Sequence, residues 1–318
     1  MDKLLITLII AILFISCNDN TVKGEETAHS NLTQAVVEIK NDAIHTPKLT
    51  TTETRDSYRI FSAPLPTDLN FCGEKAPIEK EYIYEKLDRE LLVNMYWQSQ
   101  TFMFIKRAHK WFPIIEPILA KNNIPDDFKY LAVIESGLDN VVSPSGAKGF
   151  WQFMPKTAIG LGMEVNEFVD ERYNLEKSTQ AACDYLNAAY SKFGNWTLAA
   201  ASYNMGKGGL NNRLNQQNVS SYYDLLLNIE TGRYIYRILA VKSILDQPEK
   251  YGFNVLDNSY YKHPTYTTIT IDSSVTDFVS FARKMDVTYN ELKILNPWLR
   301  DKSLPNPTNK EYSIKIMD

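Results

Sequence analysis

Apolar residues recur at helical spacing from about Glu79 to about residue 255, and this pattern restricts the fold more than any other in the chain. No segment in this range shows the alternation that is typical of a β-strand. The segments expected to be helical are Tyr84 to Ala108, Phe112 to Asn122, Asp126 to Ser136, Ser178 to Phe193, Trp196 to Tyr203, Ser221 to Asn228 and Gly232 to Leu245. Ser178 is the expected N-cap of its helix, and Gly194 is expected to end that helix. The sequence therefore predicts a mainly α domain over residues 79 to 255.

One acidic residue lies on the apolar face of such a helix. Phe128, Leu131, Ala132 and Glu135 are spaced i, i+3, i+4 and i+7, which places them on one face. Gly137 is a typical helix stop, so Glu135 lies in the last turn. Burial and the negative end of the helix both disfavour a carboxylate, and both raise its pKa towards that of a general acid. From the helix alone, a solvated glutamate at the edge of the stripe is the favoured alternative.

Four short motifs follow one another along the chain. They are Glu135-Ser136, Gly149-Phe150-Trp151-Gln152-Phe153-Met154-Pro155, Ser202-Tyr203-Asn204-Met205-Gly206, and Glu230-Thr231 followed by Tyr234. In this order and spacing the chain resembles the goose-lysozyme-like lytic transglycosylases, and most of all the membrane-bound lytic murein transglycosylase D type. Ser202 stands where that family usually has Ala. The resemblance implies a lysozyme-like helical catalytic domain over residues 79 to 255.

The resemblance also implies a reaction. The family cleaves the β-1,4 bond between N-acetylmuramic acid and N-acetylglucosamine in peptidoglycan and forms 1,6-anhydromuramoyl ends without water. Glu135 would act first as acid and then as base, which requires a pKa near the working pH. The implied substrate-binding residues are Ser136, Gln152, Tyr203, Asn204 and Tyr234, with the Tyr234 hydroxyl orienting the acid.

These residues also have purely structural interpretations. Ser136 can satisfy backbone groups at the helix end, and Gln152 can hold a loop. Asn204 can adopt the left-handed conformation at a helix terminus. Tyr234 can pack in the core, and so can Trp151, whose ring could otherwise stack on a sugar.

Two other functions are compatible with the same fold. A true lysozyme would use water and, if inverting, a second carboxylate about 6.5–9.5 Å from Glu135. Asp139, Glu164 and Asp170 are close in sequence, but they are interpreted as surface charges. A non-catalytic wall-binding lipoprotein would keep the fold without the chemistry, and the intact Glu135 argues against it.

The N-terminus predicts export and lipid attachment. Leu4 to Ile15 is an unbroken apolar run, too short to span a bilayer and typical of a signal peptide. Phe14-Ile15-Ser16-Cys17 resembles a lipobox, so residues 1–17 are expected to be a lipoprotein signal peptide with Cys17 as the lipidated residue. The alternative is an ordinary secretory peptide with an incidental cysteine. We expect a cell-envelope protein that is lipid-anchored to the periplasmic face of the outer membrane.

The remaining segments predict a tether and a small C-terminal module. Residues 18–78 are polar and lack a sustained period, which indicates a flexible tether. After a linker around Tyr251 to His263, residues 264–318 show a β-α-α-β order. Its segments are Tyr266 to Ile271, Asp277 to Met285, Tyr289 to Leu295 and Tyr312 to Ile316. This order resembles a LysM module, which binds glycans, although Asp272-Ser273-Ser274 replaces the usual Gly-Asp pair.

Several partners are disfavoured by composition. The net charge is -4 and no basic stripe is present, which argues against nucleic acid. The four histidines are scattered and neither Cys-x-x-Cys nor a phosphate-binding glycine loop occurs, so no metal and no cofactor are expected. Besides Cys17 the chain has Cys72 and Cys183. An oxidising compartment permits a bridge between them, but a free buried thiol is favoured for Cys183. The expected partners are peptidoglycan strands and membrane lipid, and nothing indicates a protein partner.

Overall fold

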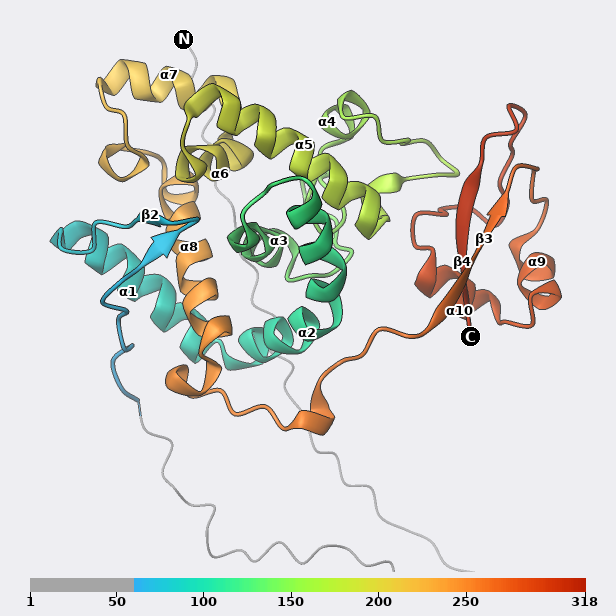
Figure 1. Cartoon of the computed structure of the whole chain (residues 1–318), viewed down its shortest axis with the longest axis horizontal. Helices are drawn as coiled ribbons and strands as arrows, with labels where there is room; N and C mark the ends of the chain where they lie inside the picture. Colours follow the sequence, from blue (N-terminus) through green and yellow to red (C-terminus); the bar gives the residue numbers. More distant parts are fainter. Residues whose placement is uncertain (1–59) are drawn as a thin grey trace, which may run out of the picture. The chain divides into compact units, whose positions relative to one another are not determined.

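A computed structural model describes residues 60–318 of the chain. The signal peptide expected at residues 1–17, the lipidated Cys17 and most of the expected tether lie outside these residues. Figure 1 shows that the described part is built mainly from helices, with a pair of longer strands near the C-terminus. None of the described helices is both long and apolar enough to cross a bilayer.

The first described residues pack against the helical domain. They include a small antiparallel hairpin formed by β1 (Asn70–Phe71) and β2 (Glu74–Lys75). Phe71 is fully buried, with its ring 5.1 Å from that of Phe128. The carboxylate of Glu74 accepts a 2.6 Å hydrogen bond from the backbone N–H of Trp196. The expected tether boundary at residue 78 is therefore too late, because a few apolar residues anchor this otherwise polar stretch.

A set of α-helices forms the larger part of the described chain. They are α1 (Glu81–Tyr96), α2 (Gln98–Lys121), α3 (Lys129–Ser136), α4 (Pro155–Gly160), α5 (Leu175–Phe193), α6 (Trp196–Met205), α7 (Lys207–Gln217) and α8 (Ile229–Asp246). α1 packs against α8, α5 packs against α2 and α6, and α3 contacts both α2 and α8 (Figure 1). The expected mainly α fold is confirmed, and α3 has neighbours on two sides.

Some helix boundaries differ from those expected. The stretch from Tyr84 to Ala108 is interrupted at Trp97, where φ -88° and ψ 58° leave the helical region. α2 then continues past Ala108 and includes Pro113 and Pro117, since packing against α5 outweighs the poor helix propensity of proline. Residues 221–228 form only the 3₁₀ turn η3 (Tyr222–Asp224) instead of a helix.

The start of α5 also differs. The helix begins three residues before the expected N-cap Ser178, and the side chain of Asn174 accepts a 3.0 Å bond from the N–H of Lys177. Asn174 is therefore the N-cap, and Ser178 is buried within the helix. Gly194 ends α5 with φ 64°, as expected.

The C-terminal residues form the expected β-α-α-β module. It consists of β3 (Tyr266–Ile271), α9 (Phe278–Lys284), α10 (Tyr289–Leu295) and β4 (Tyr312–Met317). The strands are antiparallel, with Tyr266 opposite Met317. Asp277 caps α9, and Thr288 with Glu291 forms a capping box on α10.

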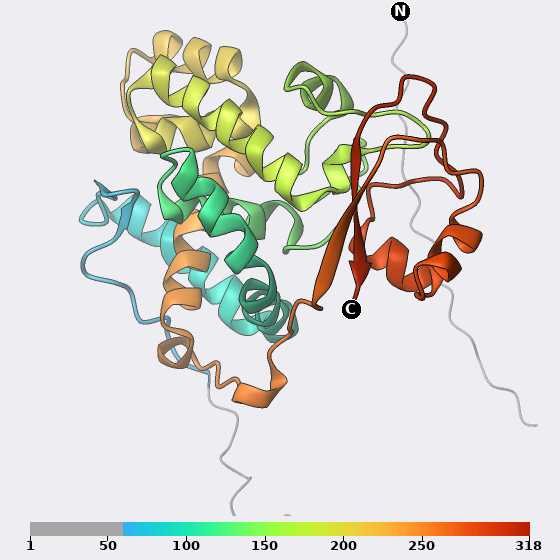
Figure 2. The same cartoon turned by 45° about the vertical axis from the view of Figure 1, so that its right-hand side comes forward.

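The module is docked against the helical domain through residues 164–176 (Figure 2). Backbone groups pair across the boundary: the N–H of Asp170 donates to the carbonyl of Trp298 at 2.9 Å, and the N–H of Arg300 donates to Phe168 at 2.7 Å. Lys310 forms a 2.5 Å ion pair with Glu164. A separate small core, which includes Val169 from the helical domain, fills the junction.

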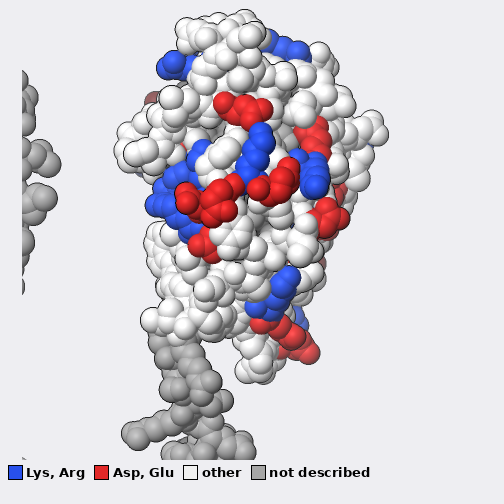
Figure 3. All heavy atoms as spheres, turned by 90° about the vertical axis from the view of Figure 1, so that its left-hand side faces the viewer, with Lys and Arg blue, Asp and Glu red and all other residues white. Residues whose placement is uncertain are grey.

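Charged side chains of both signs are interspersed on the face of the molecule drawn in Figure 3. Lys and Arg lie beside Asp and Glu instead of gathering into a field of one sign. This distribution agrees with the small net charge of the chain.

Candidate active site

Glu135 occupies the last turn of α3, where Gly137 terminates the helix with φ 65°. Neighbouring arginines hold the carbonyl oxygens at this end. Arg237 donates to the carbonyl of Ile134 at 2.8 Å, and Arg107 donates to that of Gly137 at 3.0 Å. A Cβ on Gly137 would lie 2.9 Å from the ring of Phe104, so glycine is needed here for both conformation and space. The helix end is thereby held in one arrangement.

The Glu135 carboxyl accepts a short hydrogen bond from the hydroxyl of Tyr234, which belongs to α8. Tyr234 is only 1% exposed, so its hydroxyl is fixed in place. Burial raises the pKa of Glu135 to about 7, against the opposing effects of the Tyr234 hydroxyl and the Arg237 charge. Such a group is partly protonated near neutral pH and can both give and take a proton.

The carboxyl lies in a cleft of about 580 Å³ between α1, α2, α3 and α8. Ser136 lines the same cleft, and its hydroxyl donates to the carbonyl of Ala132 at 3.2 Å. Two further acids line it: Glu230 at the start of α8 and Glu90 of α1. The cleft therefore combines three acids with two arginines, Arg233 and Arg237, and Glu135 lies at the end of α3.

Glu90 differs from Glu135 because it is firmly ion-paired. The guanidinium of Arg233 donates to both of its carboxylate oxygens, at 2.6 and 3.0 Å, and Arg89 adds a contact at 2.7 Å. A buried carboxylate with such bidentate partners is fixed in orientation. Glu90 is therefore suited to holding α1 and α8 together along the cleft.

The three acids interpreted as surface charges differ in position. Asp139 is half-exposed and pairs with Arg107 at 2.7 Å. Asp170 is 2% exposed and forms a two-point pair with Arg172, so its interpretation as a surface charge is wrong. Glu164 holds Lys310 of the C-terminal module. None of the three lines the cleft that contains Glu135.

Arg172 holds the loop that carries the second motif. Its guanidinium donates to the carbonyls of Phe153 and Gly146, at 3.1 and 3.2 Å. Gly149 lies directly against the carbonyl oxygen of Arg172, where an added Cβ would be only 1.9 Å away. Its φ of 80° is also a conformation that favours glycine. Glycine is therefore required at position 149, because the backbone of Arg172 leaves no room for a side chain.

Two aromatic motif residues behave differently. Trp151 is fully buried and donates to the hydroxyl of Thr179 at 2.9 Å, so it is a core residue and cannot stack on a sugar. Tyr203 donates to the carbonyl of Trp151 at 2.8 Å. Burial, and after it the nearby Glu135 carboxylate, raises the pKa of Tyr203. Tyr203 therefore lies close to the acid.

The two motif amides are placed as follows. Gln152 donates to the carbonyls of Gly149 and Val141, at 2.7 and 3.1 Å, so its amide nitrogen holds the loop. Asn204 is an ordinary helical residue of α6, and the positive φ falls on Gly206, which caps the helix. The suggested left-handed conformation of Asn204 is therefore wrong. Neither amide lines the cleft around Glu135, and their binding of substrate stays a prediction.

Sequence reasoning overlooked four charged residues of the site: Glu90, Arg107, Arg233 and Arg237. One of them carried a usable signal, since Glu90 follows Ile83 and Leu87 on the buried face of α1. This is the same pattern, an acid on an apolar stripe, that identified Glu135. The arginines carry no such signal, because only the fold brings them to these carbonyl and carboxylate groups. Within residues 60–318, no cluster of three or more potential metal-ligating His, Cys, Asp or Glu side chains occurs.

The two parts of the chain match known families. Residues 112–226 match the family described as the transglycosylase SLT domain. Residues 267–317 match the soluble lytic transglycosylase C-terminal LysM-like domain. The chain therefore carries a transglycosylase SLT domain followed by a LysM-like domain, as the four motifs and the β-α-α-β order predicted.

The individual proteins that the chain resembles have low sequence identity to it. The chain is 25% identical over 243 residues to the membrane-bound lytic murein transglycosylase D of Escherichia coli, and the match covers 74% of this chain and 52% of that protein. The protein of the same name from a second strain gives the same values. The chain thus spans about half the length of these curated relatives. A solved structure of an inactive mutant of lytic transglycosylase Slt from Pseudomonas aeruginosa is 19% identical, with a TM-score of 0.34, over 47% of this chain and 26% of that chain.

Proposed function

We propose that this protein is a peptidoglycan lytic transglycosylase. It cleaves the β-1,4 bond between N-acetylmuramic acid and N-acetylglucosamine and leaves 1,6-anhydromuramoyl ends. The observation that carries the proposal is the Glu135 carboxyl, which faces a cleft, has a pKa of about 7 and is held by the Tyr234 hydroxyl. The transglycosylase SLT match and the named relatives support it.

The proposed reaction uses one carboxyl group twice. Protonated Glu135 gives its proton to the glycosidic oxygen, and the bond from that oxygen to C1 breaks. The 2-acetamido group of N-acetylmuramic acid stabilises the cationic C1. Ionised Glu135 then takes the proton of the C6 hydroxyl, whose oxygen closes on C1. Glu135 ends as it began, protonated, and no water is consumed.

The proposed positioning residues surround the acid. Tyr234 orients the carboxyl through its hydroxyl, and the placement of Tyr203 near Glu135 supports a role at the sugar. Ser136 lines the cleft and can contact substrate. Gln152 and Asn204 are proposed to contact the substrate farther from the acid. Gln152 holds the motif loop through its amide nitrogen, and the rest of its amide can still form hydrogen bonds with the substrate.

A hydrolase on the same fold is a second candidate, and one observation favours it. Glu230 lines the cleft and contributes to the electrostatic environment of Glu135, so a second carboxylate is present there. A water-using enzyme would need this group as base or nucleophile. Glu230→Gln would then abolish cleavage, whereas a transglycosylase that relies on Glu135 alone would keep a substantial rate.

The proposed location is the cell envelope. We infer that Cys17 is lipidated and anchors the chain to the periplasmic face of the outer membrane, with the polar residues after it acting as a tether. The lipobox-like sequence and the relatives named as membrane-bound support this inference.

The experiment that tests the proposed function compares wild type with Glu135→Gln on purified sacculi. The amide keeps the size of the side chain but has no acidic proton, so glycan cleavage should fall to background. A folded Glu135→Gln protein that still releases fragments at the wild-type rate would refute the assignment. Circular dichroism and the melting temperature of both proteins control for folding.

A further inference from the structure

Trp97 is an exposed aromatic residue in the cleft that contains Glu135. It lies at the break between α1 and α2 and is 61% exposed. Most tryptophans are largely buried, because so large an apolar ring is unfavourable in water. Val93 and Ile229 line the same cleft and are exposed as well. The cleft therefore offers uncovered apolar surface to a ligand.

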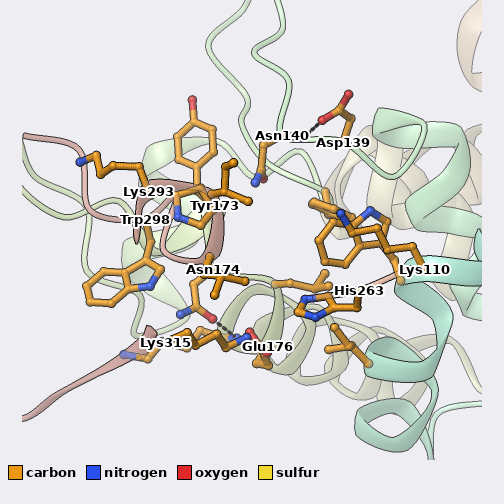
Figure 4. A pocket seen from close by; sticks show the side chains of 18 of the residues that line it. Lys110, Asp139, Asn140, Tyr173, Asn174, Glu176, His263, Lys293, Trp298 and Lys315 are labelled. Atoms are coloured by element: carbon orange, nitrogen blue, oxygen red, sulfur yellow. Dashed lines mark hydrogen bonds and ion pairs between the residues drawn. The ribbon is translucent and has the colours of Figure 1, made fainter. Parts of the chain in front are cut away.

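The rings of the other four tryptophans are covered by the protein itself. Each is buried or packs against another aromatic ring: Trp111, Trp151, Trp196 and Trp298. Trp298, for example, lies on the wall of the cavity drawn in Figure 4 but stacks on Tyr312 and is only 4% exposed. Within residues 60–318, the Trp97 side chain has neither a ring partner nor a hydrogen bond. Its ring faces and its N–H group are therefore open to a ligand.

The backbone fixes the position from which the Trp97 ring projects. Its N–H donates to the carbonyl of Val93 at 2.9 Å, and its carbonyl accepts from the N–H groups of Gln100 and Thr101 at 3.1 and 3.2 Å. The Thr101 hydroxyl also donates to the carbonyl of Asn94 at 2.5 Å, which connects α2 to α1 across the break. A ligand that covers the ring therefore does not have to order the backbone beneath it.

A polar group lies between the Trp97 ring and the catalytic helix. Gln100 lines the cleft, and its side-chain amide has no hydrogen bond within the part of the chain that the structure describes. Its Nε2 lies 3.4 Å from the place that a Cβ on Gly137 would occupy, so the amide is beside the end of α3. Trp97 precedes Gln100 by three residues, about 4.5 Å along a helix. One wall of the cleft thus leads from the end of α3 to an amide and then to an aromatic ring.

This arrangement is complementary to a sugar ring. A β-linked pyranose carries its hydroxyl groups around its edge, whereas its two faces present C–H groups. The C–H groups pack against the negative face of an aromatic ring, and the hydroxyl groups need donors and acceptors such as an amide. Trp97 and Gln100 offer these two kinds of contact side by side.

We propose that Trp97 is a substrate-binding residue whose ring stacks on a sugar next to the bond that Glu135 cleaves. The Gln100 amide binds hydroxyl or acetamido groups at the edge of the strand. The proposal rests on the proposed function, because it assigns the glycan to the cleft. It gives to Trp97 the stacking contact that the buried Trp151 cannot make.

The experiment measures binding and turnover with soluble, peptide-free oligosaccharides of alternating N-acetylglucosamine and N-acetylmuramic acid. Binding is measured by calorimetry, with cleavage blocked by Glu135→Gln. Trp97→Ala removes the ring, and Trp97→Phe keeps a smaller aromatic face. The matched control is Tyr84→Ala, which removes an exposed aromatic ring from α1, outside the cleft.

We expect Trp97→Ala to weaken binding about five- to tenfold, as for the loss of one aromatic contact. Trp97→Phe should recover part of this loss, and Tyr84→Ala should bind like the parent protein. In the active enzyme, Trp97→Ala should raise KM while kcat stays within about twofold, because the ring binds substrate and transition state alike. Unchanged binding in Trp97→Ala, or a loss that Trp97→Phe does not reduce, would overturn the proposal.

Two controls separate this proposal from folding and from the proposed function. The Trp97 side chain is exposed, so each variant should keep the melting temperature of its parent. If wild type cleaves the oligosaccharides and Trp97→Ala binds them normally, only the role of Trp97 fails. If wild type cleaves none and the Glu135→Gln protein binds none, the proposed function fails, and the role of Trp97 fails with it.

Discussion

At the scale of single residues, the reactivity of Glu135 results from competing neighbours. Burial disfavours its charged form, whereas the Tyr234 hydroxyl and the Arg237 guanidinium favour it. The result is a pKa of about 7, which a carboxyl needs if it is to act as acid and then as base. Each neighbour comes from α8, so the position of one helix against α3 sets the proton affinity of the site.

Replacement of Tyr234 by Phe tests this balance. The hydroxyl lowers the pKa of Glu135, so its removal should move the alkaline limb of the pH–rate profile to higher pH. Turnover should fall about tenfold, because a hydrogen bond that orients the acid is lost. The matched control is Tyr251→Phe, which removes the hydroxyl of another buried tyrosine, in η4 (Pro248–Tyr251) and outside α3 and α8. A similar pH profile in both variants would mean that Tyr234 only packs in the core.

The raised pKa of Glu135 also predicts a pH-dependent stability. Its stabilising contribution is fully present below the unfolded value of 4.5 and is lost as pH rises to about 7, because the buried group then ionises. At pH 8 the folded wild type should carry a penalty of about 3 kcal/mol that Glu135→Gln lacks. Denaturant unfolding at pH 4 and pH 8 measures this difference. An equal stability difference at both pH values would show that Glu135 is not desolvated.

At the scale of elements, the motif loop between α3 and α4 is fixed by its contacts with η2 (Glu171–Tyr173). Arg172 donates to two of its carbonyls and is itself held by the carboxylate of Asp170. The buried pair therefore connects the loop to the segment on which the C-terminal module docks. Its role is to fix the loop that follows the catalytic helix.

Substitution of Gly149 tests how tightly this loop is packed. An alanine Cβ would meet the Arg172 carbonyl at 1.9 Å in addition to the strain of a positive φ. Gly149→Ala should lower the free energy of unfolding by about 2–4 kcal/mol. Gly162→Ala is the control, since Gly162 has φ 83° but open space around it, and it should cost only about 1 kcal/mol. Equal losses in chemical denaturation would mean that the contact with Arg172 is unimportant.

Much of the fold could be predicted from the sequence, because hydrophobic spacing and capping residues are local signals. Gly137 and Gly194 ended their helices as expected, and the strand Tyr266–Ile271 was located to the residue. The break at Trp97 could not be predicted, since the apolar period continues across it and only tertiary packing separates the two helices. The residues of the site also divide into those with a local sequence signal and those placed only by tertiary packing. Its own helix marks Glu135 as an acid on an apolar face and the four motifs identify it as the catalytic acid, whereas Arg237 is placed by the contact of α3 with α8.

At the scale of the whole molecule, the two matched domains are joined by more than a linker. Glu164 holds Lys310 and Tyr312, and Arg300 lies over the ring of Tyr173 at 4.1 Å. These contacts hold the module in a fixed place against the helical domain.

The anchoring of the whole molecule gives a prediction of its own. Cys17→Ala should release the full-length protein from the membrane fraction, because the lipid is the proposed anchor. The cleavage activity of the released protein on isolated sacculi should equal that of wild type, since the site lies in the helical domain. Fractionation followed by immunoblotting checks this prediction. Unchanged retention in the membrane would exclude Cys17 as the anchor.

The central claim concerns the product, and the masses of the fragments test it most directly. Purified protein is incubated with sacculi, and the soluble muropeptides are analysed by mass spectrometry. A lytic transglycosylase should release ends with the mass of 1,6-anhydromuramic acid, one water lighter than reducing ends, and Glu135→Gln should release none. Fragments from the wild type that carry reducing ends from the start of the digest would contradict the claim, because they would show that water, and not the C6 hydroxyl, attacks C1.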